Sequence, residues 1–332
     1  MGNLPRWDGT TPRFYEVWYF IFVDRATGDG FWIRYTLLNP LAADPGAGAT
    51  LWFGYTCAAD PGRNLAISRT YQAPAFTIAR DRFAVGIGEA TLREGALAGG
   101  FEAHGRRVGW DLTYAPAPAP HYFFGPLLRY VAELRSSATL PNPQIELVGT
   151  VQIDDRVLRV GGPGHQAHHW GSQRAPRWLW AHCSAFAEDE RAIVELLAPA
   201  LPGGITLTFV TLHTAQRTIA CTGAVDLLSN SSSAGLGFWQ FTGYHGRTRV
   251  VADIRVDPRQ VLKFVYTSPD MRLSDCWNTQ VGDCLVRVYE RAGSGETLTQ
   301  VLRARGTAAA EVHDECPERI AYPAWWRAQP TG

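Results

Sequence analysis

Histidines gather in one part of this chain. Four of its nine histidines, His165, His168, His169 and His182, lie within eighteen residues, and the first three follow a glycine-rich stretch, Gly161–Gly164, that we expect to form a turn. Glycines let the backbone pass close to the imidazole rings, and an imidazole can give or take a proton near neutral pH. This stretch is therefore the first candidate for acid–base chemistry.

Two other roles stay open for the rings of His165, His168 and His169. They could hydrogen-bond to backbone groups and serve only the structure. They could also bind a metal through the pattern His-x-x-His-His, but no cysteine or carboxylate stands near it at a recognisable spacing. We therefore expect neither a metal nor another cofactor.

Tryptophans follow the histidines at the spacing of a strand. Trp178, Trp180 and His182 alternate along the chain, so an extended backbone places all three side chains on one face. Aromatic rings stabilise cations, and such a face could line the wall of a pocket. In the first half, Trp18 stands in a similar aromatic run and is expected either in the core or in contact with a substrate.

Two acidic residues interrupt apolar runs. Glu16 opens the run that contains Trp18, and Glu195 lies within the run Ile193–Leu197. The ordinary expectation is an exposed or arginine-paired Glu16 and a half-exposed Glu195. If either side chain is buried instead, its pKa can rise toward neutrality and it becomes a candidate proton donor.

Short apolar runs recur along the chain and predict antiparallel β-structure. Asp154-Asp155 and His245-Gly246 stand between such runs, as the turns of hairpins do. A helix is expected at 125–135, where apolar residues fall at helical spacing, and loops at Ala115–Pro120 and Ser229–Ser233. The predicted strands are Glu16–Val23, Gly30–Leu38, Thr50–Thr56, Leu65–Tyr71, Arg107–Tyr114, Ile145–Ile153, Trp178–Phe186, Ile205–His213, Gly237–Tyr244, Thr248–Val256, Val261–Thr267 and Leu285–Arg291.

Length and internal similarity predict two domains. The chain has 332 residues, and each half opens with an aromatic-rich strand. We therefore expect two related β-barrels, at residues 10–160 and 161–326, in an all-β protein with one short helix.

Composition excludes several classes of function. The formal net charge is zero, which gives no basic surface for nucleic acid. The six cysteines stand apart without a C-x-x-C pair and are expected as buried thiols. The first nine residues are polar and unlike a signal peptide, so a cytoplasmic protein is expected.

Two stretches resemble a known family. Glu16-Val17-Trp18-Tyr19-Phe20 is similar to the opening of a lipocalin-like family that includes carotenoid 1,2-hydratase, tocopherol cyclase and bacterial AttH-like proteins. His168-His169-Trp170-Gly171, followed by Pro176-Arg177-Trp178-Leu179-Trp180, resembles the family's second signature. The order and spacing agree as well.

This resemblance implies two lipocalin-like (calycin) barrels with a cavity for an apolar isoprenoid or polyene, which could be taken up through contact with a membrane surface. It implies His168 as proton donor or as organiser of the site, and Trp170 as a ring facing the cation. The family's Tyr-x-Asp pair is missing where this chain has Glu195, so hydration of a carotenoid in particular is put in doubt.

The resulting hypothesis is a cofactor-independent hydratase or cyclase acting on a prenylated or terpenoid double bond. It places His168, Glu195 and Glu16 in proton transfer, and its expected substrate contacts are Trp18, His165, His169, Trp170, Trp178, Trp180 and His182. A non-catalytic carrier of an apolar metabolite and a shape-driven pericyclase acting on a polyene are the alternatives.

Overall fold

The structure is a computed structural model that describes residues 2–39, 41–42, 47–72, 75–123, 136–201, 203–293 and 295–314. Regular structure in these ranges is almost entirely β-strand. The helix expected at 125–135 and Cys316 lie outside the described residues. The chain divides into two compact units: unit 1 extends to Arg174 and includes Thr267–Leu273, and unit 2 takes the rest of the described chain.

The boundary between the units falls later than the sequence predicts. β12 (Arg156–Gly171) crosses the expected boundary at residue 160 without a break and pairs with β1 (Tyr15–Val23) in unit 1. A cut inside β12 would separate it from that partner, so unit 1 continues past the end of this strand.

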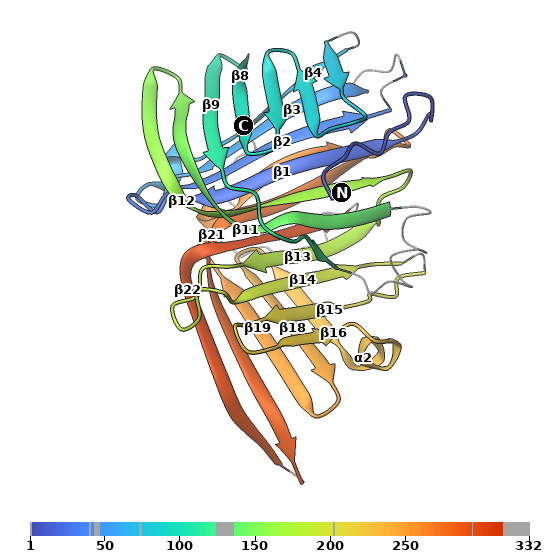
Figure 1. Cartoon of the computed structure of the whole chain (residues 1–332), viewed down its shortest axis with the longest axis vertical. Coiled ribbons are helices and arrows are strands. Elements are labelled where there is room, and N and C mark those ends of the chain that lie inside the picture. Colours follow the sequence, from blue (N-terminus) through green and yellow to red (C-terminus); the bar gives the residue numbers. More distant parts are fainter. Residues whose placement is uncertain are drawn as a thin grey trace, which may run out of the picture. The chain divides into compact units, whose positions relative to one another are not determined.

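Unit 1 is an antiparallel sheet that curls around a core of its own (Figure 1). Its strands follow the order β4-β3-β2-β1-β12-β11-β9-β8-β7-β6-β5, and β10 pairs with β11. The other strands and the 3-10 helix η1 have the bounds β2 Gly30–Leu38, β3 Gly48–Thr56, η1 Pro61–Arg63, β4 Leu65–Tyr71, β5 Phe76–Ile78, β6 Ala84–Ile87, β7 Ala90–Arg93, β8 Ala96–Ala103, β9 Arg106–Tyr114, β10 His121–Tyr122 and β11 Ser136–Ile153.

Aromatic side chains dominate the core of unit 1. β1 sends Trp18, Phe20 and Phe22 into it, because alternate residues of a strand point to the same side. Trp110 joins them and donates a hydrogen bond from Nε1 to the Tyr35 hydroxyl at 2.9 Å. We call this side of each sheet its core face and the opposite side its outer face. β1 and β2 are buried along their whole length, so their outer-face side chains are buried too.

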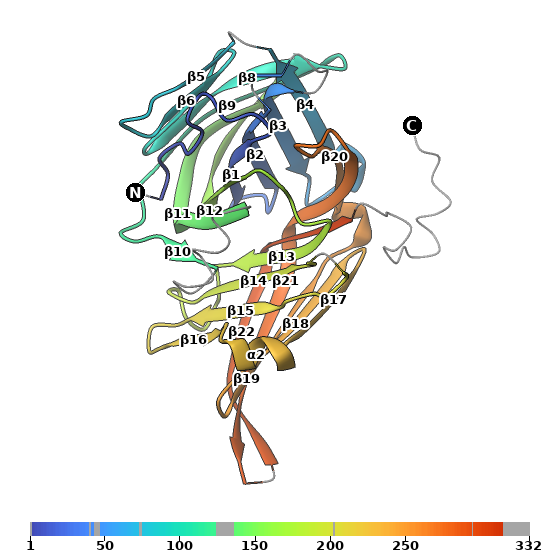
Figure 2. The same cartoon turned by 90° about the vertical axis from the view of Figure 1, so that its right-hand side faces the viewer.

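Unit 2 is a second antiparallel sheet, ordered β16-β15-β14-β13-β22-β21-β19-β18-β17, with β20 paired to β21. α2 joins β16 to β17 and lies against β18 (Figure 2). The elements are β13 Arg177–Cys183, β14 Ile193–Pro199, β15 Phe209–His213, β16 Thr218–Cys221, α2 Ala224–Ser229, β17 Ser231–Gly235, β18 Phe238–His245, β19 Thr248–Arg255, the 3-10 helix η2 Pro258–Gln260, β20 Leu262–Thr267, β21 Leu273–Ala292 and β22 Gly295–Asp314.

The core of unit 2 is separate and less aromatic. It gathers Leu179 and Val194 with the rings of Trp239 and Trp277. The five described cysteines of the chain are buried and none of them forms a disulfide, which confirms the expectation of buried thiols for these five. Among the described helices, none is long and apolar enough to cross a membrane.

The glycine-rich stretch does not form the expected turn. Gly161–Gly164 is extended within β12 and paired with its neighbours. A Cβ on Gly162 would stand 1.9 Å from the Val23 carbonyl oxygen, and one on Gly164 would stand 2.3 Å from that of Ile21. Glycine is therefore needed here for the close approach of β12 to β1.

Candidate functional site

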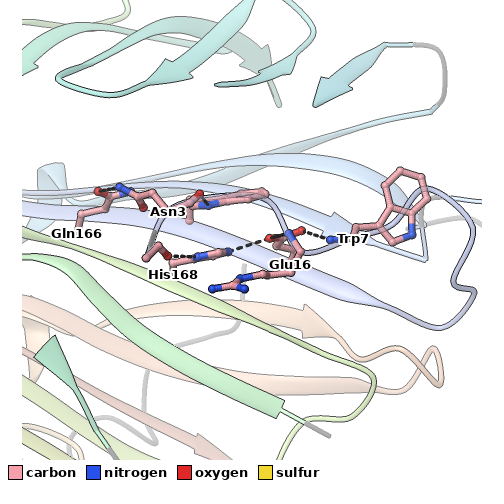
Figure 3. A network of polar contacts seen from close by, with 8 residues as sticks. Asn3, Trp7, Glu16, Gln166 and His168 are labelled. Carbon is pink, nitrogen blue, oxygen red and sulfur yellow. Dashed lines mark hydrogen bonds and ion pairs between the residues drawn. The ribbon is translucent and has the colours of Figure 1, made fainter. Parts of the chain in front are cut away.

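Glu16 and His168 come together on the core face of unit 1 (Figure 3). Nε2 of His168 lies 2.8 Å from Oε1 of Glu16, and both side chains are fully buried. The other ring nitrogen, Nδ1, lies 2.7 Å from the carbonyl oxygen of Gly2. Because both neighbours of the ring are acceptor oxygens, the contacts are all satisfied when both nitrogens carry protons and Glu16 is a carboxylate.

The N-terminal segment covers this pair. The backbone N–H groups of Arg6 and Trp7 donate to Oε1 and Oε2 of Glu16 at 2.7 and 3.0 Å. The Arg6 guanidinium lies over the Trp170 ring, 4.8 Å from its centroid. Every polar atom of the Glu16–His168 pair thus has a partner within the chain, and the pair holds the N-terminal segment in place.

The two tryptophans beside His168 belong to the same cluster. The Trp18 ring stacks on the imidazole with centroids 5.0 Å apart, and the Trp170 ring lies at 4.7 Å. Trp18 Nε1 donates to the carbonyl oxygen of Asn3 at 3.3 Å, and the side-chain amides of Asn3 and Gln166 exchange two hydrogen bonds. These rings therefore pack against the segment that closes the pair.

A second acid–base pair lies on the outer face of unit 2. His182 of β13 and Glu195 of β14 are cross-strand partners, and Nδ1 of His182 lies 2.8 Å from Oε1 of Glu195. Their side chains are only 2% and 4% exposed. Burial raises the pKa of the Glu195 carboxyl, and the neighbouring His182 offsets this only in part. Oε2 of Glu195 is buried and has no hydrogen-bond partner among the described residues.

Aromatic rings extend this pair along β13. The Trp180 ring lies within 10° of parallel to the His182 ring, with centroids 6.5 Å apart. Trp178 stacks on His313 of β22 at 3.5 Å and donates from Nε1 to Oε1 of Glu311 at 2.6 Å. The spacing of Trp178, Trp180 and His182 therefore gives the shared face that the sequence predicts.

His165 and His169 lie on a third surface, the outer face of unit 1. The Tyr19 ring contacts both of them edge-on, with centroid distances of 6.1 and 5.4 Å. Burial, together with nearby cations of which Arg34 acts most strongly, lowers the pKa of His169 from 6.5 to about 3. His169 is therefore neutral near pH 7.

The predicted site residues thus separate into three clusters. Strand alternation explains the separation of the histidines, because His168 points to the core face of β12 while His165 and His169 point to its outer face. Cross-strand register explains the pairings of Glu16 with His168 and of Glu195 with His182. Among the described residues, no three His, Cys, Asp or Glu side chains converge in a way that could hold a metal ion.

Several residues of these clusters were not among the predicted site residues, and three of them carry a charge or an imidazole ring. Glu311 and His313 alternate at the end of β22, a strand that the apolar pattern does not reveal. Arg34 is the only charged residue of Gly30–Leu38, and a lone charge inside an apolar strand is a signal that could have been read.

Two curated relatives come from Mycobacterium tuberculosis. They are the uncharacterized proteins Rv0493c of strain H37Rv and MT0513 of strain CDC 1551 / Oshkosh. Each is 27% identical to this chain over 327 residues, which cover 95% of this chain and 93% of the relative. No family model matches the chain.

Solved structures with the same fold include an AttH-like protein, NE1406 from Nitrosomonas europaea, with a TM-score of 0.59 at 12% identity over 91% of this chain and 92% of that one. The structure of CghA with Sch210972 matches with a TM-score of 0.52 at 12% identity, over 91% of this chain and 88% of that one. Kievitone hydratase from Nectria haematococca matches with a TM-score of 0.53 at 10% identity, over 90% of this chain and 88% of that one. The fold is therefore AttH-like and lipocalin-like, as predicted, and at these identities the likeness extends to the fold alone.

Proposed function

We propose that this chain is a hydratase or cyclase that protonates a carbon–carbon double bond, with Glu195 as the proton donor and His182 as its partner. One observation carries the proposal: Glu195 Oε2 is a buried carboxyl oxygen without a partner among the described residues, while His182 holds Oε1. Burial keeps this carboxyl protonated to a higher pH than an exposed glutamate. A protonated carboxyl with one uncommitted oxygen is a suitable donor for an alkene.

The reaction balances without a cofactor. A proton passes from Glu195 Oε2 to one alkene carbon, which leaves a carbocation on the other carbon and a carboxylate on the protein. The Trp180 ring can stabilise this cation through its π face. Addition of water followed by loss of one proton gives an alcohol, and addition of the substrate's own hydroxyl gives a ring. The released proton returns to Glu195.

His182 has a defined part in that return. When Glu195 is protonated on Oε2, Oε1 is an acceptor, so Nδ1 of His182 carries the hydrogen and Nε2 is the basic nitrogen. His182 can take the proton from the adding oxygen and pass it on to Glu195. The buried pair therefore handles both the outgoing and the returning proton.

A prenylated or terpenoid substrate suits this site best. Protonation of a trisubstituted isoprenoid double bond gives a tertiary cation, which aromatic faces such as those of Trp178 and Trp180 stabilise. Two proteins of the same fold support this kind of chemistry, since one is named a hydratase and the structure of the other holds the organic compound Sch210972.

The test is incubation of the protein with prenylated quinols, acyclic carotenoids and polyene terpenoids in deuterated water, followed by mass spectrometry. We expect a product with deuterium on carbon, and Glu195→Gln should slow its formation by at least about 100-fold, because general acid catalysis of this kind is worth two to four orders of magnitude. Glu190→Gln, an exposed glutamate of the same unit, is the matched control and should leave the rate unchanged.

Two outcomes would overturn the proposal. Cyclised product without deuterium that persists in Glu195→Gln would show a shape-driven reaction. Substrate that binds tightly and is recovered unchanged from the wild-type protein would show a carrier.

A further inference from the structure

Arg34 is a buried cation in an otherwise uncharged strand. It lies on the outer face of unit 1, and the residue is only 5% exposed. Its Nε donates to Thr36 Oγ1 at 2.9 Å, and its guanidinium carbon lies 5.7 and 5.5 Å from the ring centroids of Trp32 and Trp52. The guanidinium is thus set among aromatic rings, where a charge is poorly solvated and interacts strongly with a counter-charge.

Among the described residues, the charges that act on the titratable groups of this face are cationic. Arg174 places its guanidinium over the Tyr15 ring, 4.6 Å from the centroid. Two titratable groups report on the charges near this face. Burial lowers the pKa of His169 and raises the pKa of Tyr15. The charged neighbours that also shift these two pKa values are cationic, and Arg34 and Arg174 act on both groups. An anion brought to this face would therefore be stabilised.

A ring nitrogen on the same face lacks a partner. Nε2 of His169 is buried and has no hydrogen-bond partner among the described residues. The ring is neutral near pH 7, so Nε2 can carry a hydrogen and donate it. Only β1 separates His169 on β12 from Arg34 on β2, a span of about 10 Å between strand axes. A buried polar atom left without a partner in a native fold calls for a missing ligand or water.

We propose that the outer face of unit 1 is a binding site for a carboxylate carried on an aromatic or conjugated body. Arg34 takes the carboxylate, His169 donates from Nε2 to one of its oxygens, and the rings of Trp32 and Trp52 pack against the apolar body. This site is independent of the proposed function, since neither Glu195 nor any other residue of unit 2 takes part.

The test compares 2-naphthoate with 2-naphthamide, a neutral compound of almost the same shape, by titration calorimetry on the full chain. We expect the wild-type protein to bind naphthoate at least about tenfold more tightly, because hydrogen bonds to charged groups contribute about 1.5–3 kcal/mol. Arg34→Gln should reduce the preference to below about twofold, and Arg34→Lys should keep part of it. Arg63→Gln removes an exposed arginine of the same unit and should keep the full preference.

Equal binding of the two compounds to the wild-type protein would overturn the proposal, and so would a preference that survives in folded Arg34→Gln protein. If Arg34→Gln does not fold, two measurements on the wild-type protein test the proposal: its preference for naphthoate and the ¹⁵N spectrum of His169. Bound naphthoate should shift the Nε2 signal of His169, and naphthamide should not. The titration needs no turnover. Failure of the carboxylate site is therefore visible separately from failure of the alkene chemistry.

Discussion

The two buried carboxylate–imidazole pairs differ in what their remaining atoms contact. Both oxygens of Glu16 accept backbone hydrogen bonds from the N-terminal segment in addition to the contact with His168. Among the residues that the structure describes, Glu195 has one hydrogen-bond partner, His182, on one of its two oxygens. The same two residue types therefore form a structural latch in unit 1 and, in the function we propose, a proton donor in unit 2. Environment, and not residue type, decides the role.

The latch predicts a large loss of stability in Glu16→Gln. The substitution removes the carboxylate that His168 and two backbone N–H groups share, and breaking one side of a buried pair costs about 3–5 kcal/mol. Urea unfolding should show this loss, and limited proteolysis should cut the chain near Arg6 more readily than in the wild-type protein.

The matched control for the latch is Glu102→Gln, an exposed glutamate of the same unit. It should change the unfolding free energy by less than about 0.5 kcal/mol. A loss of similar size in both variants would contradict a latch role for Glu16.

At the level of strands, the contact between β1 and β12 depends on Gly162 and Gly164, where a Cβ would collide with β1. A Cβ on Gly162 would meet the backbone oxygen of Val23 at 1.9 Å, whereas one on Gly161 would meet nothing closer than 3.4 Å. Gly162→Ala should therefore force the strands apart and cost about 1–3 kcal/mol, as overpacking does, while Gly161→Ala should be nearly neutral. Thermal unfolding of the two variants measures the difference, and equal melting temperatures would contradict the close approach of these strands.

The sequence predicts some strands well because their pattern is complete in one segment. Gly30–Leu38 and Leu65–Tyr71 agree with the structure at both ends, since each is a continuous or alternating apolar run bounded by turn residues. β22 was missed because its exposed half is polar, and the strand depends on pairing with β21 and β13. Within the Ser-rich run expected as a loop, Ser231–Ser233 belong to the edge strand β17, because backbone hydrogen bonds to β18 do not require apolar side chains.

The candidate site could be predicted only residue by residue. Local spacing identifies His182, Trp180 and Glu195 as candidates, but the contact of Glu16 with His168 joins positions 152 residues apart and depends on which strands pair. Burial of Glu195 and the partner of each oxygen follow from cross-strand register, which a single sequence does not contain.

For the molecule as a whole, two buried groups tie stability to pH in opposite directions. Glu195 ionises near pH 4.5 in the unfolded chain and at higher pH in the folded protein, so the folded state binds more protons and stability falls as pH rises from 4.5 through the folded pKa. The pKa of His169 falls from 6.5 to about 3 on folding, so the unfolded state binds more protons and stability is lost as pH falls from 6.5 toward 3.

Replacing each group should flatten one side of the stability profile. Glu195→Gln should gain stability relative to the wild-type protein as pH rises above 4.5, and His169→Asn should gain relative stability as pH falls below 6.5, each by at most about 1.4 kcal/mol per pH unit. Chemical unfolding from about pH 4 to about pH 8 measures both differences. Because each variant is compared with the wild-type protein at the same pH, the exposed acids and bases cancel. If the stability difference between a variant and the wild-type protein stays constant with pH, the replaced group has the same pKa in the folded and unfolded states. Burial would then not shift the pKa of that group, and the role assigned to it from burial would be contradicted.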